Sequence, residues 1–277
     1  MAAFEDVLGG HAQAQIRLEP MGFFDRLKLP ETSSLTDLNA PETTLLHRSI
    51  LQKKSFLKAL YIDFYRTFEA AVPDLDRKFC VELGSGGGFI QELFPSIRTS
   101  DVLKLPGLDY CFSALEMPFE DRAVDAFFMV DVFHHLPEVR RFLSEADRCL
   151  KPGGKIVVIE PANTPGGRFI YQRFHHEPFD PNAGWELSSG GPLSSANGAL
   201  PWIVFVRDLE VFKRDFPNFR LDRVVYHTPL RYLISGGFTL RQMLPGSAYG
   251  AVKGLEWLTA FLNPLVGLFM TVELTKQ

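Results

Sequence analysis

The segment from Phe79 to Phe94 constrains the fold more than any other part of this chain of 277 residues. A short apolar run, Phe79–Leu83, leads directly into Gly84-Ser85-Gly86-Gly87-Gly88, and the residues from Phe89 onward have the pattern of a helix. Glycine adopts positive φ easily and lets a ligand approach the backbone closely. A strand, a glycine-rich turn and a helix in this order predict the ligand-binding turn of a parallel α/β sheet.

Further strand-like runs alternate with helical segments, which indicates a doubly wound sheet. The predicted strands are Phe79–Leu83, Arg98–Leu103, Leu108–Ser113, Asp125–Val132, Lys155–Glu160, Arg220–His227 and Phe269–Lys276. The predicted helices are Pro41–Val72, Phe89–Phe94, Glu138–Leu150, Asp208–Phe216 and Val252–Leu262, with a short helix around Gly22–Leu29 in a leader of weak pattern.

Charge and cysteine content exclude several classes of function. The net charge of −4 gives no general basic surface for binding phosphates, so a nucleic-acid partner is not expected. Cys80, Cys111 and Cys149 form no CxxC pair, which argues against a disulfide framework or a structural zinc site and favours a reducing cytoplasm.

Targeting signals are not expected either. The first residues have neither the basic start nor the apolar core of a signal peptide. The most apolar stretch, Trp257–Val272, is shorter than the roughly 20 residues of a spanning helix, so the sequence predicts a soluble protein without a transmembrane segment. Peripheral membrane contact and the oligomeric state stay open.

The glycine-rich turn departs from the dinucleotide fingerprint. That fingerprint, GxGxxG, needs a third glycine where this chain has Phe89. Glu82 lies two residues before Gly84, and Asp101 follows at the end of the next predicted strand, where an acid accepts hydrogen bonds from ribose hydroxyls. A nucleoside site is therefore favoured. A nicotinamide-dependent oxidoreductase and a non-catalytic cofactor-binding scaffold of the same fold are the alternatives.

Four segments together resemble the class I S-adenosylmethionine-dependent methyltransferases, of the type 11-like group that acts on small molecules. They are Val-Glu-Leu-Gly-Ser-Gly-Gly-Gly at 81–88, Ser-Asp-Val at 100–102, Leu-Glu-Met-Pro-Phe-Glu-Asp at 115–121 with Val-Asp-Ala at 124–126, and Cys-Leu-Lys-Pro-Gly-Gly-Lys-Ile at 149–156. The resemblance is strong over residues 78–161. It implies a Rossmann-like, seven-stranded, mostly parallel sheet whose last strand is antiparallel, with N-terminal helices and a cap insertion.

The resemblance also implies one domain with distinct segments. Residues 1–77 would form an N-terminal helical lid, 78–161 the cofactor-binding core, 162–206 an insertion or cap, and 207–277 the C-terminal half of the sheet with a second insertion at 228–248. Aromatic residues throughout the first insertion favour an ordered cap; they are Phe169, Tyr171, Phe174, Phe179 and Trp185.

The resemblance assigns the cofactor S-adenosylmethionine to named positions. Glu82 would orient the turn, with Ser85 in it, and Gly84 and Gly86 would line the methionine part. Asp101 would hold the ribose, and Asp131 would face the sulfonium. The adenine would lie between Val102 and Leu115, with Ser113 and Ala114 at its edge; Ser113 stands where many relatives carry an acid.

Methyl transfer needs a base only when the acceptor must lose a proton. His134 and His135 follow the fourth predicted strand, and a neutral imidazole suits this role. Tyr171, His175 and His176 are candidate contacts to the acceptor. Adjacent side chains diverge, so His175-His176-Glu177 is not expected to chelate a metal, and none is predicted. The phenylalanine-rich composition and the apolar C-terminal helix favour a small or amphipathic, lipid-like acceptor.

Overall fold

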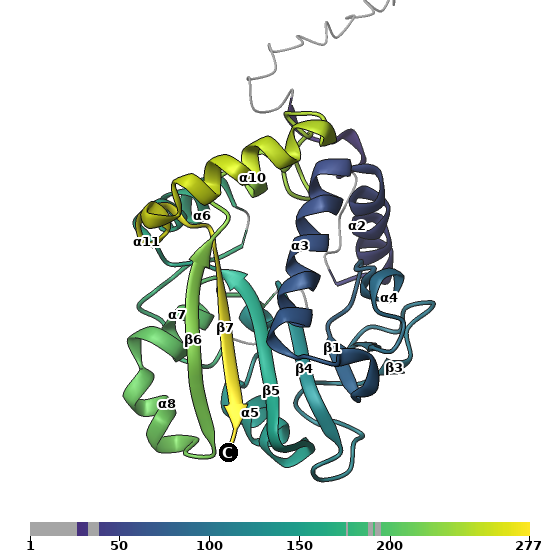
Figure 1. Cartoon of the computed structure of the whole chain (residues 1–277), viewed down its shortest axis with the longest axis vertical. Coiled ribbons are helices and arrows are strands. Elements are labelled where there is room, and N and C mark those ends of the chain that lie inside the picture. Colours follow the sequence, from purple (N-terminus) through teal and green to yellow (C-terminus); the bar gives the residue numbers. More distant parts are fainter. Residues whose placement is uncertain (1–26, 33–38, 176, 188–190, 192–194) are drawn as a thin grey trace, which may run out of the picture.

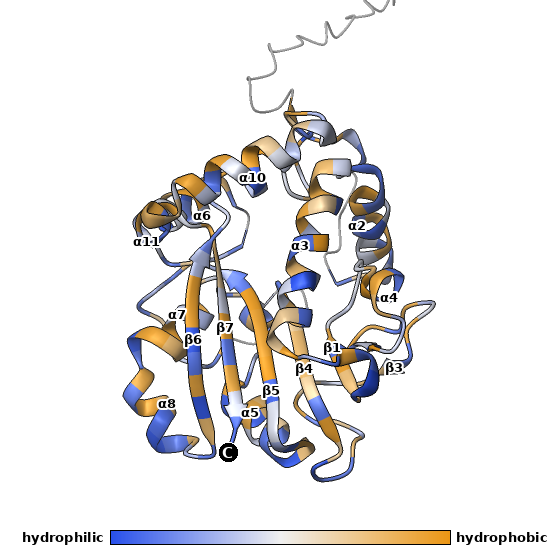
Figure 2. Cartoon of the chain, in the orientation of Figure 1, coloured by the Kyte–Doolittle hydropathy of each residue, from blue (hydrophilic) through white to orange (hydrophobic). Residues whose placement is uncertain are grey.

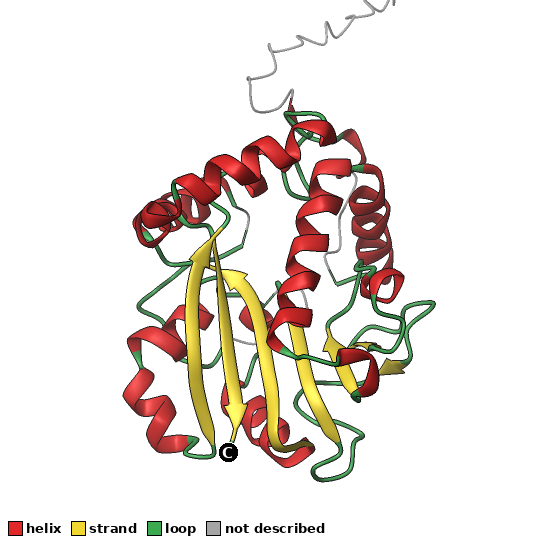
Figure 3. Ribbon diagram, viewed as in Figure 1, coloured by secondary structure: helices red, strands yellow, loops and turns green. Residues whose placement is uncertain are grey.

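A seven-stranded sheet flanked by helices forms the centre of the protein (Figures 1 and 3). The structure, a computed structural model, describes residues 27–32, 39–175, 177–187, 191 and 195–277. The strands are β1 (Cys80–Leu83), β2 (Arg98–Asp101), β3 (Tyr110–Cys111), β4 (Val124–Val130), β5 (Leu150–Pro161), β6 (Phe219–His227) and β7 (Phe269–Lys276).

The strand order is β3-β2-β1-β4-β5-β7-β6. Strand β1 pairs in parallel with β2 and β4, and β4 pairs in parallel with β5, whereas β7 is antiparallel to both β5 and β6. This confirms the predicted doubly wound sheet with an antiparallel last strand. The order reverses between β1 and β4, and ligands of such sheets bind at the carboxyl ends of the strands beside this reversal.

Helices cover the sheet and its carboxyl edge. The longer ones are α2 (Pro41–Lys53), α3 (Ser55–Ala71), α5 (Val139–Cys149), α6 (Pro165–Phe174), α8 (Leu209–Asp215) and α10 (Tyr249–Leu258). The shorter ones are α4 (Ile90–Leu93), α7 (Leu200–Trp202), α9 (Arg231–Ser235), α11 (Asn263–Val266), η1 (Pro30–Thr32), η2 (Leu75–Arg77), η3 (Phe133–His135), η4 (Ile203–Arg207), η5 (Gly246–Ala248) and η6 (Ala260–Leu262).

The apolar periodicity of the N-terminal region correctly predicts which face of α3 is buried. Leu57, Leu60, Phe64 and Phe68 recur every three or four residues and are all buried. Phe68 stacks on Phe128 of β4, with ring centroids 4.5 Å apart. Burial of side chains of this size contributes about 1.5–3 kcal/mol each. This packing fixes α3 against the central strands, next to the glycine-rich turn.

The single helix predicted over residues 41–72 is wrong, because the chain breaks at Lys54. Lys54 has extended backbone angles (φ −87°, ψ 94°) between α2 and α3. Its ammonium group donates to the carbonyl oxygens of Gly237 and Leu240, and burial lowers its pKa to about 8. The break therefore ties the N-terminal helices to the segment that follows α9.

Other boundaries also differ from the prediction. Strand β5 begins at Leu150 rather than Lys155, because the Lys-Pro-Gly-Gly segment joins the sheet through a register shift opposite Val124. Strand β3 is shorter than predicted, and the C-terminal helix is divided into α10 and η6. The short helix expected around 22–29 falls mainly on residues that the structure does not describe.

The described parts of the first insertion pack against the sheet domain. Tyr171, Phe179 and Trp185 are buried, whereas Phe169 and Phe174 are exposed. The division into lid, core and cap stays a prediction. Within the described residues, no helix is long and apolar enough to cross a membrane.

Candidate active site

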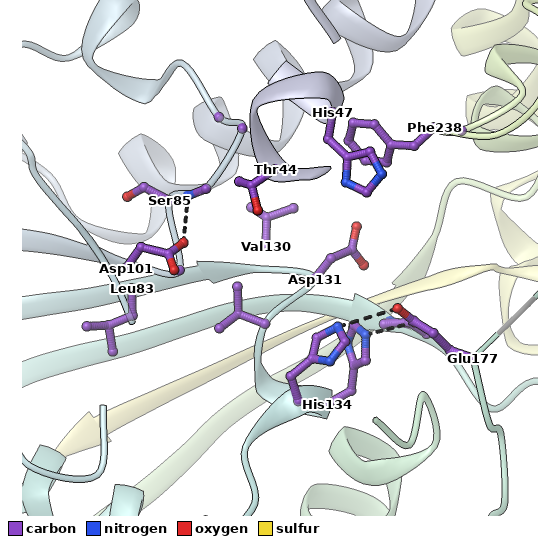
Figure 4. A pocket seen from close by; sticks show the side chains of 18 of the residues that line it. Thr44, His47, Leu83, Ser85, Asp101, Val130, Asp131, His134, Glu177 and Phe238 are labelled. Atoms are coloured by element: carbon purple, nitrogen blue, oxygen red, sulfur yellow. Dashed lines mark hydrogen bonds and ion pairs between the residues drawn. The ribbon is translucent and has the colours of Figure 1, made fainter. Parts of the chain in front are cut away.

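A cavity of about 540 Å³ lies at the carboxyl ends of the strands, where the strand order reverses. Helices α2, α3 and α6 and the segment after α9 complete its wall. Asp101 lies at one end and Glu177 at the other, with His47 and Phe238 on a facing wall (Figure 4). Cavities that bind small molecules have volumes of about 300–1,000 Å³.

The glycine-rich turn forms one end of the cavity. Gly84 has a φ of +66°, and a Cβ atom there would lie 2.5 Å from Cγ2 of Val132. Gly86 has a φ of +42° and donates its N–H to Oδ2 of Asp101 at 3.0 Å. Ser85 donates its N–H to the carbonyl of Ser100 at 2.8 Å. Glycine is therefore required at Gly84 by both conformation and space.

Glu82 of β1 is a buried acid with an unsatisfied oxygen. Burial, reinforced by the charge of Asp101 and opposed by a hydrogen bond with Ser85, raises the pKa of Glu82 to about 8. Among the described residues, its Oε2 has no hydrogen-bond partner. Since Glu82 lines the cavity, this oxygen is positioned to serve a polar or cationic ligand.

Asp101 ends β2 and points into the same part of the cavity. Besides the N–H of Gly86, it accepts the N–H of Leu103 at 2.8 Å. Burial raises its pKa, although these backbone donors oppose the shift. A carboxylate has about four acceptor positions, so Asp101 can accept further hydrogen bonds from a ligand's hydroxyl groups. Val102, beside it, is half exposed and also lines the cavity.

The turn after β3, where the resemblance predicts the adenine edge, reaches the cavity. Ser113, Ala114 and Leu115 all line the cavity. The Ser113 hydroxyl accepts the N–H of Leu115 at 3.2 Å. A hydroxyl that accepts one hydrogen bond keeps its own proton for donation, so Ser113 can act as a donor to a ligand.

Asp131 follows β4 and adopts left-handed backbone angles, with a φ of +55°. Aspartate tolerates this region better than most residues. Its N–H donates to the carbonyl of Ile159 at 3.0 Å, and its side chain faces the cavity (Figure 4). Burial, reinforced by the charge of Glu160, raises the pKa of Asp131 to about 8, although His134 opposes the shift.

A cluster of histidines and carboxylates lies at the other end of the cavity, and we call it the histidine–carboxylate cluster: Asp131, His134, His135, Glu160 and Glu177. His134 contacts Glu160 through Nδ1 at 2.6 Å and Glu177 through Nε2 at 3.2 Å. The Nε2 atom of His135 lies 3.5 Å from Oε1 of Glu177. Residues from β5, η3 and the segment after α6 are thus brought together.

The two histidines differ in charge. Burial alone would lower the pKa of His134, but the charges and hydrogen bonds of Glu160 and Glu177 hold it well above its usual value. Burial and the neighbouring His134 lower the pKa of His135 to about 4. Glu177 has a pKa well below its usual value, because its contacts with His134 outweigh burial. These pKa shifts favour a cationic His134 and a neutral His135, and a role for either as a base stays a prediction.

The predicted acceptor contacts have different surroundings. Tyr171 lines the cavity, but its hydroxyl donates to the carbonyl of Leu268 at 2.7 Å, so its ring is the part left for a ligand. His175 also lines the cavity, with Nδ1 3.6 Å from Oε2 of Glu177. His176 lies outside the described residues.

Several residues in or behind the wall of the cavity were not predicted from the sequence. Glu160 stands at the end of a mostly apolar predicted strand, and an acid in that position could have been recognised as a candidate site residue. The hydroxyl of Tyr65 of α3 accepts the N–H of Phe89 at 3.1 Å and so holds the end of the glycine-rich turn. Helical periodicity alone cannot indicate this contact. Thr44 and His47 of α2 line the cavity as well.

Comparison with known families decides what this domain is. The sequence profile of the family described as "Methyltransferase domain" matches residues 96–158, which run from before β2 into β5. Residues 96–158 belong to a class I methyltransferase domain. This confirms the resemblance drawn from the segments at 100–102, 115–126 and 149–156, and with it S-adenosylmethionine as the cofactor.

Part of the chain is also similar to curated enzymes. It is 44% identical over 52 residues to the phthiotriol/phenolphthiotriol dimycocerosates methyltransferase of Mycobacterium tuberculosis, covering 18% of this chain and 19% of that one. It is 44% identical over 48 residues to the ubiquinone/menaquinone biosynthesis C-methyltransferase of Brucella anthropi, covering 17% and 18%. The alignments thus span about a fifth of these relatives.

Solved methyltransferase structures give only distant matches. One, an S-adenosylmethionine-dependent methyltransferase from Mesorhizobium loti, is 13% identical, covers 82% of this chain and 100% of that chain, and has a TM-score of 0.44. Another, a geranyl diphosphate C-methyltransferase from Streptomyces coelicolor, is 15% identical, covers 88% of each chain, and has a TM-score of 0.47.

The residues present in this methyltransferase domain fit the cofactor. The glycine-rich turn leaves no room for a Cβ at Gly84, and the unpaired Glu82 oxygen lines the same cavity. S-Adenosylmethionine carries a cationic sulfonium and an amino group, which suit a cavity lined by Glu82, Asp101 and Asp131.

Proposed function

We propose that this protein transfers a methyl group from S-adenosylmethionine to a small amphipathic acceptor that has an apolar tail. The observation that supports it is a second, apolar groove of about 430 Å³ that shares Ile170 and Leu233 with the main cavity. A polar head in the main cavity and an apolar tail in this groove would fit one such acceptor.

The residues at the glycine-rich end would bind the cofactor in the roles expected from the family. Asp101 would hold the ribose, Glu82 would orient the turn, and Asp131 would face the sulfonium. When bound, the cofactor supplies an electrophilic methyl carbon, whose bond to sulfur breaks as the acceptor attacks, with the electron pair passing to sulfur. The chain's contribution is positioning and exclusion of water, because the methyl group is already activated.

An acceptor hydroxyl must also lose its proton, and we assign this step to the histidine–carboxylate cluster. As long as the cluster binds protons and no other cation, His135 is the neutral imidazole in it. His135 also lines the cavity. His134 is held as a cation between Glu160 and Glu177 and positions Glu177 rather than accepting a proton. His135→Ala should therefore lower kcat with little change in cofactor affinity.

An exposed apolar surface beside the groove supports an amphipathic acceptor. Figure 2 shows hydrophobic residues along α10 and α11. We call this surface the C-terminal apolar face; its exposed residues are Leu255, Trp257, Leu258, Phe261, Leu262, Leu265 and Val266. Trp257 is 77% exposed and Phe261 is 76% exposed. Apolar patches of this kind mark partner or membrane surfaces.

The relatives' names agree with this chemistry. One is named for phthiotriol dimycocerosates and another for ubiquinone and menaquinone. Leu255, Leu262 and Val266 line both the groove and the C-terminal apolar face. We infer that the face contacts a membrane surface peripherally and that the groove receives the tail of an acceptor dissolved in it.

The test is incorporation of label from radiolabelled S-adenosylmethionine into lipid extracts and into polar metabolites, compared side by side. Label in the lipid fraction is expected. A Trp257→Ser, Phe261→Ser double variant should raise KM for the vesicle-borne acceptor and leave binding of S-adenosylhomocysteine unchanged. Val225→Ser, at an exposed valine of β6, is the matched control.

Three results would contradict the proposal. Label in polar products alone would exclude the lipid-like acceptor. Stabilisation against heat by NADH and not by S-adenosylhomocysteine would exclude the cofactor. Cofactor binding without turnover on any acceptor pool would favour a non-catalytic scaffold.

A further inference from the structure

His134 and His135 both direct their Nε2 atoms at the carboxylate of Glu177. His134 Nδ1 lies 2.6 Å from Oε2 of Glu160, and His135 Nδ1 lies 3.0 Å from the carbonyl oxygen of Ser195. A carbonyl and an ionised carboxylate only accept hydrogen bonds, so each Nδ1 carries a proton. In the neutral tautomer, both Nε2 atoms then present lone pairs, and both face Glu177.

A proton on His134 Nε2 satisfies only one of these lone pairs, whereas a divalent cation between the three groups would bind both. The Nε2 atoms of His134 and His135 are 3.2 Å and 3.5 Å from the Glu177 oxygens, and the three ligand atoms all lie within 4.8 Å of one another. Donors placed about 2.0–2.1 Å from a tetrahedral ion are separated by about 3.3–3.4 Å. The two separations between histidine and carboxylate are thus close to an edge of a metal coordination tetrahedron, and the three ligand atoms are near enough to share one ion.

We propose that His134, His135 and Glu177 bind a divalent transition-metal ion of the zinc type. Two imidazole nitrogens and one carboxylate are ligands typical of Zn²⁺ and its first-row neighbours, whereas Mg²⁺ and Ca²⁺ prefer oxygen ligands alone. Sequence spacing does not reveal these three ligands. Glu177 lies more than 40 residues after the two histidines, and the side chains next to it in the sequence point in different directions.

The groups around the three ligands have the arrangement that metal sites use. Metal-bound histidines donate their other ring N–H to a carboxylate or a backbone carbonyl, which fixes the ring orientation. Glu160 serves His134 in this way, and the Ser195 carbonyl serves His135. Glu160 is itself fixed by the N–H groups of Val132 and Phe133, at 2.9 Å and 2.7 Å.

The site opens to the main cavity, because all three ligand residues line it. Three protein ligands leave a coordination position for water or substrate, as in catalytic zinc sites. If the proposed function holds, an oxygen of the acceptor would occupy that position and lose its proton more easily; with His135 bound to the metal, Asp131 or solvent would accept that proton in its place. Metal binding itself does not depend on the methyl-transfer proposal.

The test is calorimetric titration of Zn²⁺ into the untagged full-length protein after treatment with a chelator, without cofactor or acceptor. One ion per chain is expected, and Co²⁺ in its place should give the visible absorption of a tetrahedral site. His135→Gln and Glu177→Gln should each weaken binding by about 100-fold or more. Glu160→Gln should weaken it by roughly 10–100-fold, as changes to a ligand's hydrogen-bond partner do.

His47→Gln is the matched control, because His47 lines the facing wall of the same cavity (Figure 4). It should bind Zn²⁺ as the unaltered protein does. The proposal is overturned if the unaltered protein binds no ion at millimolar Zn²⁺, or if His135→Gln and Glu177→Gln bind it equally well. Binding of S-adenosylhomocysteine, measured in the same samples, reports separately on folding and on the proposed function.

Discussion

Glu82 should make the folded protein less stable as pH rises, and replacing it with glutamine should remove this effect. Burial raises the pKa of Glu82 from 4.5 to about 8. Between these values the folded protein holds a proton that the unfolded chain has released, so the free energy of unfolding falls as pH rises. At about 1.4 kcal/mol per pH unit, Glu82 costs about 3 kcal/mol at pH 7 and about 5 kcal/mol above pH 8.

The assay is urea denaturation of both proteins, without ligand, at intervals from pH 5 to pH 8. The stability difference in favour of Glu82→Gln should grow by about 4 kcal/mol over this range. Asp101 and Tyr65, which interact electrostatically with Glu82, are present in both proteins and affect the difference little. Glu116→Gln, at an exposed side chain, should show no such trend. A constant difference between pH 5 and pH 8 would refute the reasoning.

Three further changes test other parts of the structure. Gly84→Ala should destabilise the fold by more than the roughly 1–2 kcal/mol that an alanine in the left-handed region costs, because its Cβ also clashes with Val132. Gly153→Ala is the control in the same denaturant melts: Gly153 has a φ of +80° and no neighbour within 4 Å, so this variant should show the conformational cost alone. Asp101→Ala should weaken S-adenosylhomocysteine binding by about 1–3 kcal/mol in calorimetry, and unchanged affinity would mean that the ribose contact is misplaced. Glu256→Gln removes the buried charge that pairs with Arg231 and should cost about 3–5 kcal/mol by urea denaturation, whereas a loss below about 1 kcal/mol would show that the pair is dispensable.

Local patterns predicted the sheet and the residues that meet at the glycine-rich end of the cavity. The glycine-rich turn, Asp101 and the residues after β3 all lie at the ends of strands that the sequence delimits, so their meeting follows from the parallel topology. The break at Lys54 could not be predicted, because the carbonyls that hold its ammonium lie more than 180 residues further along the chain.

The acceptor end depended on contacts that no local pattern contains. His134 and His135 were identified by their position after a strand, but their charges depend on Glu160 and Glu177, which approach from other segments. The two carboxylates raise the pKa of His134, whereas burial and the charge of His134 lower the pKa of His135. A sequence pattern can locate such residues, but the folded neighbours determine their protonation.

The antiparallel insertion of β7 between β5 and β6 has a consequence for synthesis of the protein on the ribosome. Strand β7 emerges about 100 residues after β5, and until then neither β5 nor β6 has its neighbour on that side. The nascent chain therefore displays two unpaired strand edges, the kind of surface that recruits other chains. Completion of the sheet waits for the last strand, so chaperone dependence during translation should be greatest just before residues 269–276 leave the exit tunnel.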